Sequence, residues 1–368
     1  MSKTYRALGV ISGTSMDGID VAFVETDGRM QVRPGAGATY PYPDHVRTAL
    51  LGLIADSARA ESADVPALEA ALTKAHGNAI ERFLHEHEIA PSKLDLIGLH
   101  GQTVFHAPQR RFTRQLGSGA EIAARFDVPT VYRFRHADVA AGGQGAPLVP
   151  LYHQALAAAL RKPLMILNLG GVGNVTYLSE SDEVIAFDTG PASAMLDDFV
   201  RRRRGVPFDA GGAIAASGKV DFEVVARFLQ HPYFARPAPK SLDRNAFHAN
   251  ATAVDALSDA DGAAILAECT VQATAAALRH VPRPPLRWLV TGGGRHNAYF
   301  MRRFAEELRV PVDPVEAVGW DGDFLEAQCF GYLAVRSLLK LPLSLPTTTG
   351  VPKPMTGGEL AEPLKRGG

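Results

Sequence analysis

The sequence predicts an α/β protein built from two similar halves. Short apolar runs alternate with segments of helical periodicity, which is typical of sheets covered by helices. Glycines cluster at the ends of several apolar runs, and the chain has 35 Gly and 25 Pro in 368 residues. An apolar run, a glycine-rich turn and a second apolar run occur near residue 8 and again near residue 164. This repeated pattern predicts a duplicated unit.

In the first half, residues 6–11 and 19–25 are apolar runs on either side of a polar, glycine-rich segment, the pattern of a hairpin. Apolar residues spaced three and four apart over 64–84 predict an amphipathic helix. Residues 94–99 predict a buried strand that ends at a polar loop. A helix over 120–126 and a strand over 130–132 follow, and a second glycine cluster precedes a helix that runs through Leu156 and Leu160.

The second half repeats this alternation. Its apolar runs predict strands over 164–168, 175–178, 184–187, 287–291 and 310–312. Its helical patterns predict helices over 192–203, 262–278, 297–308 and 323–339. Residues 342–368 are rich in Pro, Thr and Gly, so we expect this segment to pack loosely or fray.

Composition excludes several classes of protein. The formal net charge is -1, so the chain lacks the basic footprint of a nucleic-acid-binding protein. The two cysteines, Cys269 and Cys329, lie in separate segments and encode neither a disulfide framework nor a CxxC metal site. The N-terminus lacks the pattern of a signal peptide, and no run of about 18 apolar residues occurs. We therefore expect a cytoplasmic protein with no membrane or nucleic-acid partner.

The glycine loops indicate phosphate binding. Backbone N–H groups in glycine-rich turns and at helix N-termini hold phosphates, hydroxyls add donors, and a nearby Asp can hold a hydrated Mg²⁺. Residues 13–18, 188–190 and 292–294 together contain these residue types. Each turn alone is weak evidence, whereas three of them at strand ends favour a nucleotide site. The P-loop, Rossmann, HExxH, GxSxG and kinase HRD signatures do not occur.

Several longer motifs resemble those of the anhydro-N-acetylmuramic acid kinases. They run in the family's order from residue 8 to about 335, and they comprise Ile11–Asp20 (ISGTSMDGID), His100–Thr103 (HGQT), Asp138–Pro150 (DVAAGGQGAPLVP), Phe187–Pro191 (FDTGP), Leu289–Asn297 (LVTGGGRHN) and Glu326-Ala327. The family belongs to the sugar kinase, Hsp70 and actin superfamily. The resemblance therefore implies two duplicated ribonuclease-H-like domains around an interdomain ATP cleft.

The resemblance also implies an activity. Family members use ATP, Mg²⁺ and water to open the 1,6-anhydro ring of anhydro-N-acetylmuramic acid and to phosphorylate O6, a step of peptidoglycan recycling. We expect a first domain over residues 1–134, to which residues 340–368 can return, and a second over 135–340. A homodimer is expected from the family as well.

Most site residues follow from the matching motifs, and Gly171 and Asn174 come from the glycine turn that follows the strand predicted over 164–168. Asp188 is implied as the catalytic base. The residues implied for nucleotide binding are Gly13, Thr14, Ser15, Met16, Asp17, Gly18, Ile19, Asp20, Gly171, Asn174, Gly292, Gly293 and Gly294. Those implied to face the sugar are His100, Gln102, Thr103, Arg135 and Glu326. Asp17 and Asp20 are candidates to hold Mg²⁺ through water, and no direct ligand is assigned.

The chain departs from the family's usual pattern at two places. Ala192-Ser193 follow Gly190-Pro191 where Gly-Asn is usual, and Arg133-Phe134-Arg135 stand where many members have Asp-Phe-Arg. Three alternatives stay open: Asp188 as a cap of the next helix, a different sugar kinase of the same superfamily, and a nucleotide-driven binding module. Structural roles are favoured for two clusters. We expect His100 and His106 to pack or form hydrogen bonds, and residues 201–204 to form a solvated helix end.

Overall fold

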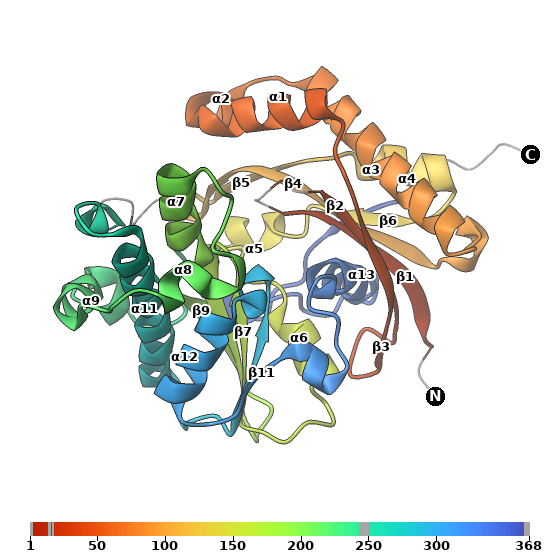
Figure 1. Ribbon diagram of the computed structural model, residues 1–368. Helices are drawn as coiled ribbons and strands as arrows, with labels where there is room; N and C mark the ends of the chain where they lie inside the picture. The colour runs from red at the N-terminus through yellow and green to blue at the C-terminus, as the bar shows by residue number, and fades with distance from the viewer. Residues whose placement is uncertain (1–2, 14–15, 17, 243–246, 248–250, 364–368) are drawn as a thin grey trace, which may run out of the picture. The chain divides into compact units, whose positions relative to one another are not determined.

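The computed structural model describes residues 3–13, 16, 18–242, 247 and 251–363 (Figure 1). The chain forms two compact units. Unit 1 comprises Met1–Ala158 and Phe324–Gly368, and unit 2 comprises Ala159–Asp323. These limits differ from the expected domain boundaries at 134 and 340, because residues 135–158 and the helix after residue 324 pack in unit 1. No helix in the described part of the chain has the length and apolarity needed to span a membrane.

Unit 1 contains a mixed sheet. Its strands are β1 (Tyr5–Ser12), β2 (Ile19–Thr26), β3 (Val32–Tyr40), β4 (Leu96–Ala107), β5 (Phe112–Leu116), β6 (Thr130–Tyr132) and β12 (Glu359–Ala361). They lie in the order β12-β6-β4-β1-β2-β3, with β5 paired to β4. β1 runs antiparallel to β2 and parallel to β4, while β3 is antiparallel to β2 and β6 is parallel to β4.

The helices of unit 1 are α1 (Asp44–Ala55), α2 (Ser57–Ser62), α3 (Pro66–Glu86), α4 (Gly119–Phe126), α5 (His136–Ala140), α6 (Pro150–Leu156), α13 (Leu325–Leu338) and α14 (Pro346–Thr349). Figure 1 shows α3 and α4 on one face of the sheet and α13 on the other. Successive side chains of β1 point to opposite faces of the sheet, which explains this arrangement. Leu8 and Val10 lie on the face that packs in one core with α1 and α3.

Glycines bring α13 directly onto the sheet. A Cβ at Gly9 would lie 1.8 Å from the carbonyl oxygen of Ala327, and one at Gly98 would lie 2.1 Å from that of Phe330. Only residues without a side chain allow this close approach of a helix to two strands. Helix α13 therefore belongs to unit 1, although it lies more than 300 residues from β1 in the sequence.

Unit 2 repeats the topology. Its strands are β7 (Leu164–Leu169), β8 (Val172–Leu178), β9 (Val184–Pro191), β10 (Arg287–Thr291) and β11 (Val312–Pro314), in the order β11-β10-β7-β8-β9. β7 is antiparallel to β8 and parallel to β10, β9 is antiparallel to β8, and β11 is parallel to β10. The strands β1, β2, β3, β4 and β6 have the same order and directions, so the predicted duplication is confirmed.

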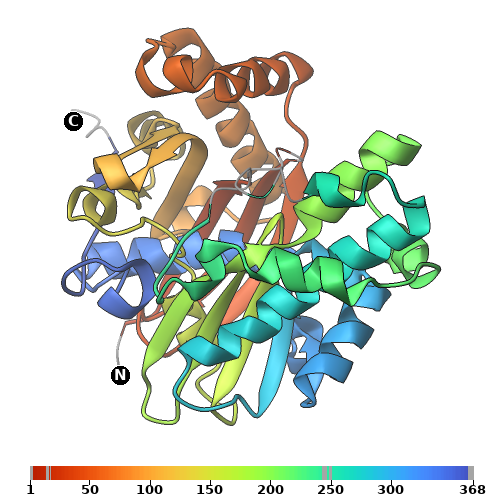
Figure 2. The ribbon, with the colours of Figure 1, turned by 90° about the vertical axis from the view of Figure 1, so that its left-hand side faces the viewer.

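The helices of unit 2 are α7 (Ser193–Arg204), α8 (Ala213–Ala216), α9 (Phe222–Leu229), α11 (Asp259–Ala276) and α12 (Ala298–Leu308). Helix α11 lies across the sheet beside β9 (Figure 2). It is buried along most of its length and forms one core with Leu167, Phe187 and Phe199. This packing supports the middle of the sheet, whose strand ends carry the predicted site residues.

Most of the predicted elements are confirmed, one stretch forms elements that were not predicted, and one prediction is wrong. The stretch 32–62, for which no element is predicted, forms β3, α1 and α2. Residues 342–361 are not loose: β12 pairs with β6, Ser344 bridges Met355, and Ser337 Oγ donates to the carbonyl of Gly357 at 2.6 Å. Backbone pairing and buried hydroxyls hold this Pro-, Thr- and Gly-rich segment in place.

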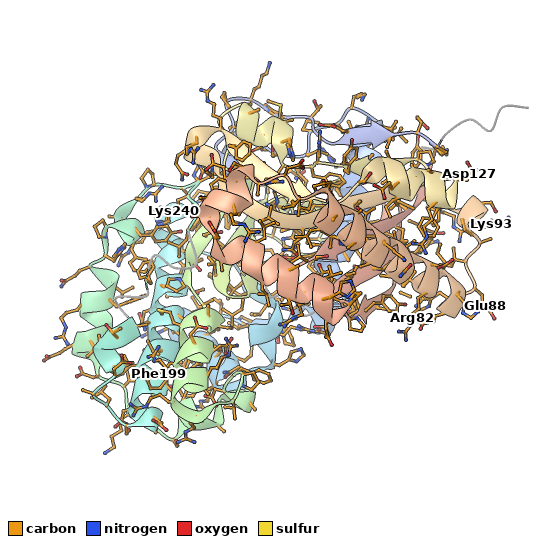
Figure 3. All side chains as sticks on the ribbon, turned by 90° about the horizontal axis from the view of Figure 1, so that it is seen from above. Arg82, Glu88, Lys93, Asp127, Phe199 and Lys240 are labelled. Carbon is orange, nitrogen blue, oxygen red and sulfur yellow. The ribbon has the colours of Figure 1, made fainter. Side chains whose placement is uncertain are left out.

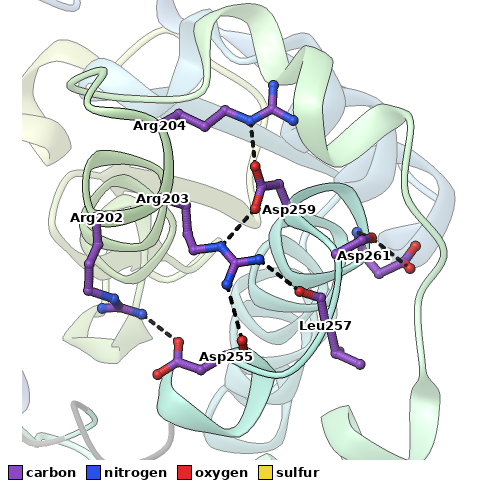
Figure 4. Close-up of polar contacts among 8 residues, drawn as sticks. Arg202, Arg203, Arg204, Asp255, Leu257, Asp259 and Asp261 are labelled. Carbon is purple, nitrogen blue, oxygen red and sulfur yellow. Dashed lines mark hydrogen bonds and ion pairs between the residues drawn. The ribbon is translucent and has the colours of Figure 1, made fainter.

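Charged side chains mark the surfaces of both units. Figure 3 shows Arg82, Glu88, Lys93 and Asp127 at one end of unit 1, where all four are exposed. In unit 2, Arg202, Arg203 and Arg204 end α7 and form ion pairs with Asp255 and Asp259 (Figure 4). The arginine run is thus exposed, as predicted, but it is paired with carboxylates rather than only solvated.

Candidate active site

The first glycine loop joins β1 to β2 in unit 1. Within it, the backbone N–H of Met16 donates to the carbonyl of Gly13 at 3.1 Å, and Arg47 Nε donates to the carbonyl of Met16 at 3.0 Å. A Cβ at Gly18 would lie 2.4 Å from the Thr39 side chain, so this position packs tightly against β3. Thr14, Ser15 and Asp17 lie outside the described residues.

Asp20 follows this loop on β2. It is partly exposed, and its carboxylate accepts a hydrogen bond from Thr39 Oγ1 at 2.7 Å, whereas the neighbouring Ile19 is buried. Across the sheet, Gly101, Ile11, Asp20 and Thr39 are register partners on β4, β1, β2 and β3. We call these four residues the first row.

The second glycine turn joins β7 to β8 in unit 2. The carbonyls of Gly170 and Gly171 accept hydrogen bonds from the backbone N–H groups of Ser193 and Ala192, at 2.9 and 3.0 Å. The turn is therefore bound to the start of α7, which is where this chain has Ala192-Ser193. The N-cap position of α7 is Ala192, so Asp188 does not cap that helix, and this alternative is wrong.

Four polar residues form the corresponding second row. Thr291, Asn168, Asn174 and Asp188 are register partners on β10, β7, β8 and β9. The strand order and directions of the two sheets place this row on the strands that correspond to those of the first row. The predicted base and the predicted nucleotide residue Asn174 are thus direct neighbours.

Asp188 is held in place by residues 233–242, which the sequence does not indicate as part of the site. The backbone N–H of Asp188 donates to the carbonyl of Lys240 at 2.9 Å, and the N–H of Leu242 donates to the Asp188 carboxylate at 2.8 Å. Tyr233 Oη donates to the Asp188 carbonyl at 2.6 Å. Residues 233–242 therefore cover the outer edge of β9 at Asp188.

Burial raises the pKa of Asp188 to about 7, and the hydrogen bond from the Leu242 N–H opposes this rise. A carboxyl group with a pKa near neutrality is half deprotonated at pH 7 and is a stronger base than an ordinary aspartate. Lys240 is also buried, and its Nζ faces two backbone carbonyls and His280. Desolvation lowers the pKa of Lys240 to about 8.

The third glycine cluster follows β10. Gly292 has φ +80°, and a Cβ there would lie 2.4 Å from Asn168 Oδ1, whereas a Cβ at Gly293 would meet open space. The buried Arg295 donates to the carbonyl of Gly292 at 3.1 Å and to Glu316 and Asp323, both at 2.8 Å. Arg295 is not among the predicted site residues, although it directly follows the three glycines in the sequence. Its guanidinium fixes the turn that carries Gly292–Gly294.

Three of the five predicted sugar-facing residues come together in unit 1. Arg135 Nε donates to His100 Nε2 at 2.9 Å, and the charge of Glu326 acts on Arg135. Gln102 is buried, and its Oε1 accepts from Tyr42 Oη at 3.2 Å. Thr103 Oγ1 accepts from Gln115 at 3.2 Å. Gln102 and Thr103 are therefore bonded within the sheet and its neighbours rather than to the Arg135 group.

The two arginines at the second departure from the family pattern differ in burial. Arg133 has φ 54°, is exposed, and pairs with Glu359 on the surface. Arg135 is partly buried, and desolvation lowers the pKa of its guanidinium. Of the two arginines, only Arg135 contacts a predicted sugar-facing residue among the described contacts, in line with its assignment.

His100 and His106 do not form a metal pair. His100 Nδ1 bonds to the Gly101 carbonyl, and His106 bonds to Thr113 Oγ1 and to the Gln144 carbonyl. Among the described residues, no group of three or more His, Cys, Asp or Glu side chains is arranged to hold a metal ion. A cavity of about 610 Å³ in unit 1 lies against the ends of α3 and α4 and is lined by none of the predicted site residues.

Comparison with known proteins identifies the family. The model of the anhydro-N-acetylmuramic acid kinase family matches residues 5–362. A relative from Acidiphilium cryptum with that name is 52% identical over 97% of this chain and 98% of its own length. A relative from Rhodospirillum rubrum with the same name is 50% identical over 96% of this chain and 93% of its own length. The chain therefore belongs to the anhydro-N-acetylmuramic acid kinase family.

Proposed function

We propose that this protein is an ATP-dependent kinase that opens the 1,6-anhydro ring of anhydro-N-acetylmuramic acid with water and phosphorylates O6. The product is N-acetylmuramic acid 6-phosphate. Family membership over nearly the whole chain supports the substrate and the reaction. The structural observation that carries the proposal is Asp188, a carboxylate with a raised pKa that lies beside Asn174 and near the glycine turns.

Asp188 performs the proton transfer in this mechanism. Its carboxylate takes a proton from a water molecule as the water oxygen bonds to C1 of the sugar. The bond between C1 and O6 breaks, O6 bonds to the γ-phosphorus of ATP, and ADP leaves. This chemistry resembles that of an inverting glycosidase, with a phosphoryl group in place of the proton that the leaving oxygen would otherwise take.

The remaining assignments follow the sequence motifs. Gly171, Asn174, Gly292–Gly294 and Gly13–Asp20 are assigned to the nucleotide, the last of these to its phosphates. His100, Gln102, Thr103, Arg135 and Glu326 are assigned to the sugar. Glycine turns suit phosphates because their N–H groups approach the ligand closely.

Mg²⁺ fits the residues present, since it keeps most of its waters and is usually held by one or two carboxylates and the substrate phosphates. Asp20 is a partly exposed carboxylate at the end of the first glycine loop, which is suited to such an outer contact. The ion would reduce the negative charge of the phosphates. We further propose a homodimer in the cytoplasm, which sedimentation and cell fractionation would test.

Product analysis tests the reaction. The protein is incubated with ATP, Mg²⁺ and anhydro-N-acetylmuramic acid in H₂¹⁸O, and the reaction is quenched before the anomeric oxygen exchanges. We expect a phosphorylated product with ¹⁸O at C1. N-acetylmuramic acid as the preferred acceptor, without label uptake, would identify an ordinary sugar kinase. ATP turnover that no sugar changes would identify a nucleotide-driven binding module.

A further inference from the structure

The second glycine cluster surrounds a buried carboxylate. Asp138, on α5, is 2% exposed, and its carboxylate accepts from the N–H of Gly145 at 2.7 Å and from the hydroxyls of Thr349, at 2.6 Å, and Ser344. A Cβ at Gly143 would lie 2.2 Å from Asp138 Oδ1. A buried carboxylate requires such donors, and the glycine allows the loop to close around it.

Two of these donors come from the C-terminal segment. Ser344 and Thr349 are more than 200 residues from Asp138 in the sequence and are themselves 1% and 0% exposed. The carbonyl of Thr349 also accepts from the N–H of Gln144 at 2.7 Å. Hydrogen bonds therefore join the segment 344–349 to the loop 138–145 in both directions. We call Asp138, Ser344 and Thr349 the carboxylate clamp.

The clamp continues to the predicted sugar-facing residues. The same Gly145 that donates to Asp138 accepts from Arg135 Nη1 at 2.7 Å through its carbonyl. Arg135 Nε then donates to His100 Nε2, so this ring nitrogen carries no proton and the proton of the neutral ring lies on Nδ1. Nearby Arg135 and His76, together with burial, hold the pKa of His100 well below its usual range.

We propose that the C-terminal segment is part of the sugar-binding machinery, and that Ser344 and Thr349 act as positioning residues for Arg135 and His100 through Asp138 and Gly145. The proposal rests on the proposed function, which assigns Arg135 and His100 to the sugar. When either hydroxyl is lost, the carboxylate turns toward its remaining donors and displaces the Gly145 peptide. Arg135 then loses a fixed acceptor, and displacements of about 0.5 Å are enough to weaken an oriented site.

Kinetics of the full-length protein test the clamp. We expect the Ser344→Ala, Thr349→Val double variant to raise the KM for the anhydro sugar about tenfold, which corresponds to about 1.4 kcal/mol. The KM for ATP stays within twofold of the wild-type value. The conservative variants Ser344→Thr and Thr349→Ser keep a donor at each position and retain most of the wild-type sugar affinity.

Ser337→Ala is the matched control. The Ser337 hydroxyl also anchors the C-terminal segment, by donating to the Gly357 carbonyl, but it does not contact Asp138. We expect this variant to lower the thermal midpoint without changing the KM for the sugar. If the clamp variants likewise lose only stability, Ser344 and Thr349 are structural residues and the proposal is wrong. The Thr349→Val single variant serves if the double variant does not fold.

A second measurement separates this proposal from the proposed function. The ¹⁵N shifts of the His100 ring, assigned with His100→Gln, report which nitrogen carries the proton. We expect the Nδ1–H form alone in the wild type and a mixture of both neutral forms in the double variant. An unchanged His100 signal overturns the clamp proposal even in an active enzyme. A wild-type protein inactive on the anhydro sugar overturns the proposed function but leaves the His100 measurement valid.

Discussion

The two rows lie on equivalent strands but place their carboxylates differently. In the first row, Asp20 lies on β2, next to the edge strand β3, is partly exposed, and accepts a hydrogen bond from the hydroxyl of Thr39 on β3. In the second row the corresponding strand β8 carries Asn174, and the carboxylate is Asp188 on the edge strand β9. Both carboxylates are partly exposed, but that of Asp188 lies on an edge strand where burial raises its pKa to about 7.

The segment that packs against the edge strand β9 explains the raised pKa of Asp188. Residues 233–242 form three hydrogen bonds with Asp188: the Lys240 carbonyl accepts from its N–H, the Leu242 N–H donates to its carboxylate, and Tyr233 Oη donates to its carbonyl. They reduce the contact of the carboxylate with water, and among the described residues they supply it with one N–H donor, from Leu242. Desolvation outweighs that donor, and the pKa rises to about 7. In the same fold, the pKa of a carboxyl group therefore depends on the segment that packs against its strand.

The strongest test of the comparison removes the negative charge of Asp188. Asp188→Asn is expected to lower turnover by at least about 10²- to 10⁴-fold, because general-base assistance is lost while the shape is kept. Nucleotide affinity, measured by titration of the inactive protein with ATP, stays near the wild-type value. Near-wild-type turnover in Asp188→Asn would remove Asp188 from its assigned role.

The pH dependence follows from the protonation of Asp188. Its pKa of about 7 lies above that of a free aspartate, so the base form is lost as the pH falls through 7 rather than through 4. At pH 5 about 1% of the carboxyl remains deprotonated, and kcat/KM is expected to fall about 100-fold from its plateau. An acidic limb centred near pH 4 in the profile of kcat/KM contradicts the raised pKa.

The next test concerns the turn beside the second row. Gly292→Ala is expected to lower the free energy of unfolding by about 2–4 kcal/mol, because a Cβ at φ +80° is strained and meets Asn168 and Leu169. We expect the affinity of the Gly292→Ala variant for ATP to fall as well. Urea denaturation and nucleotide titration measure both effects.

Gly293→Ala provides the control for that test. A Cβ at Gly293 meets open space, so stability is expected to change by less than about 0.5 kcal/mol. Equal losses in the two variants would show that the turn does not depend on the close approach of Gly292 to Asn168.

Apart from the Gly293→Ala control, Asp20→Asn gives the smallest expected effect. The variant keeps a side chain that can accept from Thr39 Oγ1 but removes the negative charge proposed to face hydrated Mg²⁺. The Mg²⁺ concentration for half-maximal activity is expected to rise about tenfold, equivalent to about 1.4 kcal/mol, with little change in kcat. A loss of kcat as large as that of Asp188→Asn would reverse the assignment of the two carboxylates.

The sequence predicts the residues of the candidate site better than it predicts the residues that hold them in place. Asp188, Asn174 and Gly292–Gly294 were predicted from motifs, and the structure brings them to neighbouring strands and turns. Tyr233 and Lys240 were not predicted, because their contacts with Asp188 span 45 residues or more and follow no local pattern. Arg295 and Asp138 lie within the family motifs, but their contacts with the loops depend on tertiary packing and have no local sequence pattern.

The sequence by itself determined the α/β class, the repeated hairpins and the positions of the glycine turns, because periodicity and turn residues act over a few neighbouring positions. Only the tertiary structure decided which unit receives α13 and the C-terminal segment, which of Arg133 and Arg135 is buried, and how far Asp188 is desolvated. These outcomes depend on contacts between distant segments, such as Gly9 with Ala327 and Asp138 with Thr349. Such contacts leave no local periodicity, and they set the burial and the hydrogen bonds on which the proposed chemistry depends.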